Sequence, residues 1–341
     1  MPARCSTAVL LTALSALSLL GGCGSDESDQ AASAPASDLR VGLVTDTGGV
    51  NDRSFNSLAV AGLRRAEREL GVDGTIVISK TPADYVPNLE KLGRADYDLV
   101  IGVGFLIAEA MDRVAARYPD TRFAVIDYSS EDLKDRSENI QGSIFDERQA
   151  GYLAGYLAGL VANGRKYPEV SAVGGERIPP VEKYIGGYRA GIKAVNPAIK
   201  VRSDYSESFT DEARCREIAD RQIAEGSKIV FQVAGKCGLG ALAAAKAAGA
   251  FGIGVDADQS YLGDFVLTSA VKEVDNAVFD TVKVTDEGEF LGGSDLTFGL
   301  FNQGVGLGKI SPAAAPYERQ LADLRLQLIS GNEGPPNRKG R

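Results

Sequence analysis

The chain is predicted to be an α/β protein with two lobes, each built around a parallel β-sheet. Strand-like apolar runs alternate with helix-like stretches from residue 40 to residue 284, which is the pattern of successive βαβ units. The strand-like runs are more numerous than one sheet of ordinary size holds. At 341 residues the chain is long enough to bury two hydrophobic cores.

The strand-like runs are rich in Val, Ile and Leu, as expected for strands that are buried on both faces of a parallel sheet. These runs are 40–45, 75–79, 98–103, 122–126, 139–144, 170–174, 199–203, 228–233, 251–255 and 265–270. Longer stretches between most of them are predicted to be helices. These stretches include 54–70, 105–117, 147–161, 181–194, 210–225, 238–249 and 275–284.

One connection differs from the others. The runs at 122–126 and 139–144 are separated by the polar segment 129–138 (SSEDLKDRSE). This segment is too irregular to predict a full crossover helix. We therefore expect the chain to change lobe near residues 140–146.

Composition excludes several classes of function. The formal net charge is −9, with 46 acidic against 37 basic residues, whereas a protein whose main partner is a nucleic acid needs a basic face. The chain has no His, which excludes hydrolase triads built on imidazole and most zinc enzymes. Without His or a CxxC pair, a metal site would need oxygen ligands alone, and no EF-hand spacing is present.

The N-terminus has the pattern of an export signal. Residues 6–20 (STAVLLTALSALSLL) are apolar and uncharged, too short for a bilayer span and suited to a signal-peptide core. The sequence LGGC that ends at Cys23 resembles the cleavage box of bacterial lipoproteins, in which the cysteine is diacylated. We expect a signal peptide at 1–22, an acylated Cys23 and a flexible polar tether at 23–38, so that the protein is anchored by lipid on the extracytoplasmic face of the cell membrane. The alternative is an ordinary secretory signal with an incidental cysteine.

Two cysteines remain once Cys5 is removed and Cys23 is acylated. Cys215 is predicted just inside a helix that Thr210 opens, and Cys237 lies in the loop after the next strand. The expected compartment permits a disulfide. We expect a Cys215–Cys237 disulfide that braces this region, with two inert thiols as the alternative.

Nucleotide-binding motifs are incomplete in this chain. The sequence GVG at 102–104 follows a strand, but Ile107 stands where G-x-G-x-x-G requires its third glycine. GKC at 235–237 and GKI at 308–310 lack the Ser or Thr of a P-loop and its upstream glycine. These incomplete motifs give no support to a nucleotide-binding enzyme.

Polar side chains recur where predicted strands end. Asp46, Asp127 and Asp256 end three runs, and Lys272 follows a fourth. Open α/β sheets bind ligands at the carboxyl ends of their strands, so this recurrence predicts a ligand cleft. Taken singly, each carboxylate is equally well explained as a helix cap or turn former, and Phe231, inside an apolar run, as a core residue.

The residues from Asp46 to Asn56 (DTGGVNDRSFN) resemble the opening of the basic membrane protein family of lipoproteins, which are purine nucleoside receptor-like substrate-binding subunits of ABC transporters. The resemblance runs in consistent order from about residue 39 to about residue 310. It includes the segments YDLVIGVGF (97–105), YP (118–119), FAVID (123–127), ERQAGYLAG (147–155), GVDADQ (254–259) and SAVK (269–272).

The resemblance implies a periplasmic-binding-protein type I fold, in which two Rossmann-like lobes joined by a three-segment hinge close over a ligand. On this basis the N-terminal lobe comprises 39–140 plus about 268–297. The C-terminal lobe comprises 141–267 plus about 298–330. A polar tail follows at 331–341.

The resemblance also implies roles for individual residues. Phe55 and Phe231 match the aromatic pair that sandwiches a nucleobase, and stacking on aromatic rings suits the two π-faces of a base. Asp127, Asp256 and Lys272 match the residues that hold the ribose hydroxyls. Carboxylates accept hydrogen bonds from such hydroxyls.

Asp46 matches the carboxylate at the edge of the base, with Thr47 and either Asn51 or Asp52 in the same ligand-binding segment. Gly235 matches a backbone contact in a loop that is usually glycine-rich in the family. Here that loop has the sequence AGKCG, in which Lys and Cys replace small residues. Because this departure changes the loop that holds Gly235, it affects both the expected backbone contact and the expected ligand preference.

We therefore expect a lipid-anchored receptor that captures nucleosides, purine nucleosides foremost, between its lobes and passes them to an ABC permease. No cofactor and no catalysed reaction are expected. Its expected partners are the nucleoside, the permease and the membrane, and not a nucleic acid. Three alternatives stay open: a sugar receptor on the same fold, a surface sensor or adhesin with a vestigial cleft, and a two-lobed dehydrogenase, which the broken glycine motif disfavours.

Overall fold

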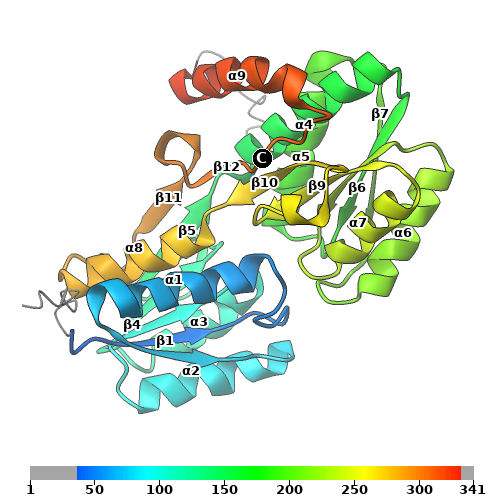
Figure 1. Cartoon of the computed structure of the whole chain (residues 1–341). Coiled ribbons are helices and arrows are strands. Elements are labelled where there is room, and N and C mark those ends of the chain that lie inside the picture. Colours follow the sequence, from blue (N-terminus) through cyan, green and yellow to red (C-terminus); the bar gives the residue numbers. More distant parts are fainter. Residues whose placement is uncertain (1–36, 332–341) are drawn as a thin grey trace, which may run out of the picture. The chain divides into compact units, whose positions relative to one another are not determined.

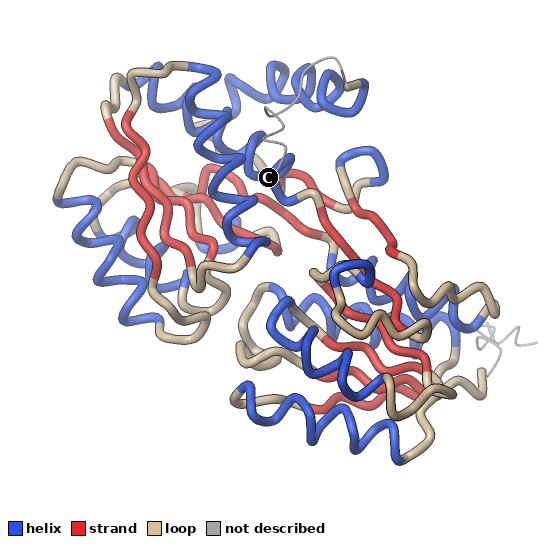
Figure 2. Tube along the Cα trace, turned by 180° about the vertical axis from the view of Figure 1, so that it is seen from behind, coloured by secondary structure: helices blue, strands red, loops and turns tan. Residues whose placement is uncertain are grey.

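The computed structural model describes residues 37–331. The expected signal peptide, the expected acylation site at Cys23, the tether up to residue 36 and the tail from residue 332 lie outside the described residues. Within the described part, two six-stranded sheets form the framework, and Figure 2 shows each of them covered by helices. The predicted α/β fold with two parallel-sheet lobes is confirmed.

The first lobe is built on a sheet in which all neighbouring strands are parallel, in the order β11-β5-β4-β3-β1-β2. Its strands are β1 (Arg40–Val44), β2 (Asp73–Val77), β3 (Leu99–Gly102), β4 (Arg122–Ile126), β5 (Ile140–Phe145) and β11 (Asp295–Phe298). From β2 the chain returns past β1 to β3, so β1 lies at a topological switch point, where open sheets bind ligands.

Helices cover both faces of the first sheet (Figure 1). Val41 and Leu43 of β1 pack in the same core as α1 and α8, whereas Val44 packs in the core with α2 and α3, because successive strand residues point to opposite faces. These helices are α1 (Phe55–Leu70), α2 (Tyr85–Arg94), α3 (Ala108–Ala115) and α8 (Val274–Asp286).

The second lobe repeats this plan with the strand order β12-β10-β9-β8-β6-β7, in which only the β10–β12 pair is antiparallel. Its strands are β6 (Glu169–Gly174), β7 (Lys200–Tyr205), β8 (Ile229–Val233), β9 (Phe251–Asp256), β10 (Val266–Lys272) and β12 (Val305–Leu307). Here β6 lies at the switch point, and β7 is an edge strand.

The helices of the second lobe pack against one another in pairs. Helix α4 packs against α5, α6 against α7, and the C-terminal helix α9 against α4. These helices are α4 (Glu147–Arg165), α5 (Pro179–Val195), α6 (Glu212–Ala224), α7 (Gly238–Ala247) and α9 (Glu318–Ser330). Short 3-10 turns complete the chain: η1 (Pro82–Asp84), η2 (Phe105–Ile107), η3 (Ser130–Asp132), η4 (Ser260–Leu262), η5 (Leu300–Asn302) and η6 (Ala315–Tyr317). No helix within residues 37–331 has the length and apolar character needed to cross a membrane.

The chain passes from one sheet to the other after β5, after β10 and between β11 and β12. The lobe boundaries expected near residues 140 and 268 fall inside β5 and β10. Each of these strands belongs wholly to one sheet, β5 to the first and β10 to the second. The polar segment 129–138 holds one short turn, η3, rather than a crossover helix.

Four elements are absent from the sequence-based expectation. Helix α2 contains Pro87 and Gly93, which are poor helix formers. Strands β11 and β12 have four and three residues, too few to show a periodic pattern. In α9 the apolar residues are spread around the helix, since Leu324 is buried while Leu326 is exposed, which obscures a helical face.

Glycines allow α4 and α5 to pack with their backbones close together. A Cβ atom at Gly155 of α4 would lie 2.0 Å from the carbonyl oxygen of Tyr188, and one at Gly191 of α5 would lie 2.2 Å from the carbonyl oxygen of Tyr152. Glycine inside a helix costs about 0.5–1 kcal/mol relative to alanine. The close helix contact offsets this cost.

We expect Gly155→Ala to lower the free energy of unfolding by about 1–3 kcal/mol, because the added methyl group has no room against a backbone carbonyl. Gly186→Ala in α5 is the matched control, since a Cβ there would meet only Arg148 Nη1 at 4.0 Å. That variant should gain up to about 1 kcal/mol from helix propensity. Urea unfolding measures both, and an unchanged midpoint for Gly155→Ala would contradict the close packing.

Candidate functional site

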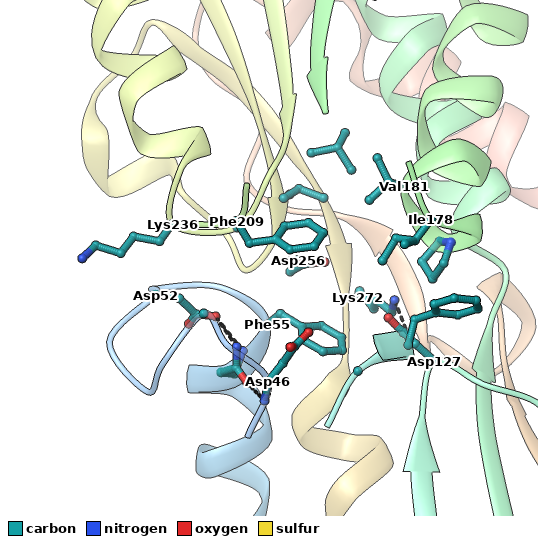
Figure 3. A pocket seen from close by; sticks show the side chains of 18 of the residues that line it. Asp46, Asp52, Phe55, Asp127, Ile178, Val181, Phe209, Lys236, Asp256 and Lys272 are labelled. Carbon is teal, nitrogen blue, oxygen red and sulfur yellow. Dashed lines mark hydrogen bonds and ion pairs between the residues drawn. The ribbon is translucent and has the colours of Figure 1, made fainter. Parts of the chain in front are cut away.

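A pocket lies at the carboxyl ends of strands from both sheets, with an empty volume of about 610 Å³ that includes its open mouth. Figure 3 shows its lining side chains. The expected site residues that line it are Asp46, Phe55, Asp127, Gly235, Asp256 and Lys272. The remaining lining residues are Gly48, Asp52, Asn56, Gly104 and Phe105 of the first lobe and Ile178, Pro180, Val181, Tyr184, Phe209, Val233, Lys236 and Val255 of the second.

Asp46 lies just beyond β1 and has one carboxylate oxygen held by the protein. Its Oδ1 accepts hydrogen bonds from the Thr47 N–H at 2.6 Å and from the Tyr85 hydroxyl of α2. Burial raises the pKa of Asp46, although the hydrogen bond from Tyr85 opposes this. Oδ2 lies beside Gly104, where a Cβ would approach it to 2.8 Å. Within residues 37–331 the hydrogen bonds to the Asp46 carboxylate go to Oδ1, so Oδ2 is open to a further donor.

Asp52 also lines the pocket, but both of its carboxylate oxygens accept hydrogen bonds from the protein itself. Its Oδ1 accepts from the backbone N–H groups of Ser54 and Ser57, both at 3.0 Å, and its Oδ2 from the N–H and the Nδ2 of Asn56 at 2.8 and 3.2 Å. The carboxylate thus binds free N–H groups at the start of α1. Asn56 Oδ1 in turn accepts the Asp46 N–H at 2.9 Å, so this cap also positions Asp46.

Lys272, the last residue of β10, is a buried cation with only 2% of its surface exposed. Its Nζ lies 2.6 Å from Asp127 Oδ1 and 2.9 Å from Glu147 Oε1. It also lies 5.2 Å from the ring centroid of Phe55. Burial lowers the pKa of Lys272, but the nearby carboxylates of Asp127, Glu147 and Asp256 together raise it above its ordinary value. The side chain therefore stays charged.

Glu147 is a site residue that the strand-end pattern misses. It begins α4, is buried, and pairs with Lys183 at 3.4 Å as well as with Lys272. It does not follow a strand directly, so only its place in the segment ERQAGYLAG marks it.

Asp127 and Asp256 both adopt the left-handed backbone conformation, with φ of 72° and 59°. This conformation is uncommon for residues other than Gly, Asn and Asp, and it occurs often at functional sites. Asp127 directly follows β4, and Asp256 ends β9. Asp256 Oδ2 accepts a hydrogen bond from Ser54 Oγ at 2.7 Å, so this carboxylate of the second lobe contacts the loop before α1 of the first.

These two carboxylates bind protons more tightly than usual. Burial raises the pKa of Asp127 to about 7, although Lys272 lowers it and Glu147 adds to the rise. Burial raises the pKa of Asp256 to about 6, again against the effect of Lys272 and of the Ser54 hydrogen bond. Both carboxylates therefore take up a proton at a higher pH than an exposed aspartate does.

Two aromatic rings lie on opposite sides of the pocket in Figure 3. Phe55 is the first residue of α1, and Phe209 lies in the loop between β7 and α6. A Cβ at Gly175 would lie 2.4 Å from Cε1 of Phe209, so glycine leaves room for this ring against the end of β6.

Phe231 does not line the pocket, which corrects the expectation that it forms the second aromatic wall. Its side chain is fully buried in β8, with its ring centroid 4.9 Å from that of Tyr188 and 6.3 Å from that of Tyr184. Strand β8 lies between β6 and β9, so a large apolar side chain there packs in the core. The signal for Phe209 is a single aromatic residue within the polar sequence SESFTDE.

The other expected residues are arranged as follows. Thr47 is partly buried and Asn51 is exposed, and neither lines the pocket. Gly235 lines it with a left-handed φ of 55°. The amine of Lys236 points away from the cavity in Figure 3 and lies 3.9 Å from Glu212.

Cys215 and Cys237 form a disulfide with a Cα–Cα distance of 5.5 Å. Within residues 37–331, no group of three or more His, Cys, Asp and Glu side chains could hold a metal ion. The pocket therefore has the features of a binding site for an organic solute: the aromatic rings of Phe55, Phe105, Tyr184 and Phe209, acceptor oxygens and one buried cation.

The family model of PnrA-like substrate-binding proteins of ABC transporters matches residues 39–331. The chain belongs to this family. Members of the PnrA-like family are solute-binding proteins rather than enzymes, and they bind a ligand and work with a permease. The resemblance that the sequence carries is thereby confirmed.

Similarity to individual known proteins, in sequence and in structure, supports the assignment to the PnrA-like family. The ABC transporter nucleoside-binding protein BmpA of Lactococcus lactis subsp. cremoris is 33% identical, with 97% of this chain and 98% of the relative covered. An uncharacterised lipoprotein of Pyrococcus abyssi is 33% identical, with 80% and 69% covered. The crystal structure of an ABC transporter solute-binding protein from Aeropyrum pernix K1 is 28% identical, with a TM-score of 0.79 and 88% and 94% covered. The periplasmic-binding-protein fold is thus confirmed.

We expect Asp256 to make the unliganded protein less stable as the pH rises from about 4 to about 6. Its pKa is about 6 in the folded protein against an ordinary value of 3.8, so the folded state binds this proton more tightly than the unfolded state. The stabilisation present below about pH 4 is lost as the pH passes the folded-state pKa. Asp256→Asn should therefore flatten the dependence of unfolding free energy on pH in this window.

Urea unfolding at several pH values measures this dependence. Asp264→Asn is the control, because Asp264 is an exposed aspartate near the same strands and its replacement should leave the slope unchanged. If the unfolding free energy changes with pH equally in Asp256→Asn and in the unmodified protein, Asp256 is not the source of this pH dependence.

Proposed function

We propose that this protein binds nucleosides, with purine nucleosides preferred, and delivers them to an ABC permease while anchored to the membrane through Cys23. The observation that carries the proposal is the pair of rings, Phe55 and Phe209, on opposite sides of one pocket. A nucleobase has two π-faces, and stacking contributes about 1–3 kcal/mol per base. The nucleoside-binding name of the relative BmpA supports the same ligand class.

The acceptors around the rings suit the rest of a nucleoside. Asp127 and Asp256 are carboxylates next to the charged Lys272, and together they can accept from and donate to neighbouring ribose hydroxyls. Hydroxyl donors would also offset the cost of burying ionised carboxylates. Asp46 Oδ2 remains for an N–H group at the edge of the base. This set fits a neutral ligand with hydroxyls and a flat ring.

We expect Phe55→Ala and Phe209→Ala each to weaken nucleoside binding by about 1–3 kcal/mol, a loss of about five- to 150-fold, because each removes one stacking surface. Calorimetry against a panel of purine and pyrimidine nucleosides, free bases and ribose measures the effect. Phe301→Ala is the control, because this ring is 64% exposed and does not line the pocket.

The panel also tests the roles of the carboxylates. Asp46→Asn should change the ranking of purine and pyrimidine nucleosides, since it alters the group at the base edge. Asp127→Asn should weaken all nucleosides alike. Ribose bound as tightly as any nucleoside, or unchanged affinity in Phe55→Ala and Phe209→Ala, would replace the nucleoside proposal with a sugar receptor on the same fold.

The proposed anchor is tested separately. Cys23 follows an uncharged apolar run and two glycines, and lipoproteins of this family support its acylation. Cys23→Ala should leave an unprocessed precursor or release the protein from the membrane fraction, as fractionation and fatty-acid labelling would show. Cys5→Ala should behave like the unmodified protein. Labelling of Cys23→Ala at the normal level would contradict acylation at this position.

A further inference from the structure

Two loops of the second lobe that line the pocket lie beside one disulfide. The first is the segment 206–211 between β7 and α6, which carries Phe209, and the second is the segment 234–237 between β8 and α7. The disulfide connects Cys237, at the end of the second loop, to Cys215 in the first turn of α6. It therefore fixes the second loop to the start of the helix that directly follows the first loop.

The disulfide lies next to the backbone of Phe209. The Cys237 N–H donates a hydrogen bond to the Phe209 carbonyl oxygen at 2.9 Å. On the other side, the Cys215 N–H donates to the Asp211 carbonyl oxygen at 3.2 Å, and the Asp211 side chain accepts from the Arg214 N–H at 3.0 Å. The segment therefore accepts a hydrogen bond from each of the two cysteines, from Cys237 at Phe209 and from Cys215 at Asp211.

The start of this segment is tied to the sheet, but its later residues are not. It follows β7, an edge strand that pairs only with β6, and the N–H groups of Ser206 and Glu207 donate to the carbonyl oxygens of Gly174 and Gly175 at 2.9 and 3.2 Å. Ser208 Oγ accepts from the N–H groups of Thr210 and Asp211, both at 3.1 Å, which closes a turn within the segment itself. From residue 208 to residue 211, the hydrogen bonds that leave the segment go to the start of α6 and to Cys237. The ring of Phe209 is only partly buried and lies beside Gly175.

We propose that the Cys215–Cys237 disulfide positions Phe209 for ligand binding, beyond any contribution to stability. This inference rests on the proposed stacking role of Phe209. With the disulfide in place, the loop is ordered before the ligand arrives. Without it, ligand binding must also order the loop, and that entropy cost lowers affinity.

The test is a double-mutant cycle measured by calorimetry with a purine nucleoside. Cys215→Ser/Cys237→Ser should weaken binding about three- to tenfold in a protein that stays folded by circular dichroism. The same pair of changes should have little effect when Phe209 is already Ala, because no ring remains to be positioned. In the Phe55→Ala background the full loss should persist, since Phe55 lies on the other lobe, across the pocket from Phe209.

Hydrogen exchange tests the positioning without any ligand. In the unliganded Cys215→Ser/Cys237→Ser variant, peptides that cover 206–211 and 234–237 should exchange about tenfold faster than in the unmodified protein. A peptide from α1 should exchange at the same rate in both.

The outcomes separate this inference from the proposed function. An unmodified protein that binds no nucleoside overturns the proposed function, and hydrogen exchange then decides the positioning role by itself. Unchanged exchange in both loops overturns the inference. So does an equal loss of affinity with and without the Phe209 ring, which would show that the disulfide acts on the fold in general.

Discussion

The buried charge of Lys272 is the constraint on which the pocket depends. A cation with 2% of its surface exposed is stable only if carboxylates lie within reach. Asp127 of the first lobe and Glu147 of the second meet that need. Because Lys272 ends β10, where the chain leaves the second sheet for α8, its ion pairs hold together the crossing segment, the end of β4 and the start of α4.

The same constraint decides which solutes suit the pocket. Around Lys272 lie the carboxylates of Asp127, Glu147 and Asp256, so acceptors outnumber the one cation. Phosphate or carboxylate groups would meet repulsion there, whereas hydroxyl and N–H donors are favoured. Burial is the main reason why the pKa values of Asp127 and Asp256 are raised, and the neighbouring carboxylates add to the rise. An uncharged ligand with several donors would satisfy this site best.

The sequence predicts most of the fold and about a third of the residues that line the pocket, for reasons that differ between residues. Strand ends are visible in sequence, so Asp46 and Asp127 of the first sheet and Asp256 of the second could be placed at the carboxyl ends of their strands, where the pocket lies. The resemblance assigns the second aromatic position to Phe231, whereas its place inside an apolar run indicates a core residue, and the structure has it fully buried in β8. Phe209 was missed because its loop has no periodicity, and its position depends on the contact with Gly175.

The two aromatic walls rest on parts of the fold with very different freedom to change. Phe55 begins α1, next to the Asp52 and Asn56 bonds that also hold Asp46, so a change there disturbs the helix cap and the acceptor together. Phe209 follows the edge strand β7, where insertions and deletions leave the pairing of the inner strands intact. Among members of the PnrA-like family, diversity in solute size should therefore arise mainly from the second-lobe wall, with the first-lobe wall varying little.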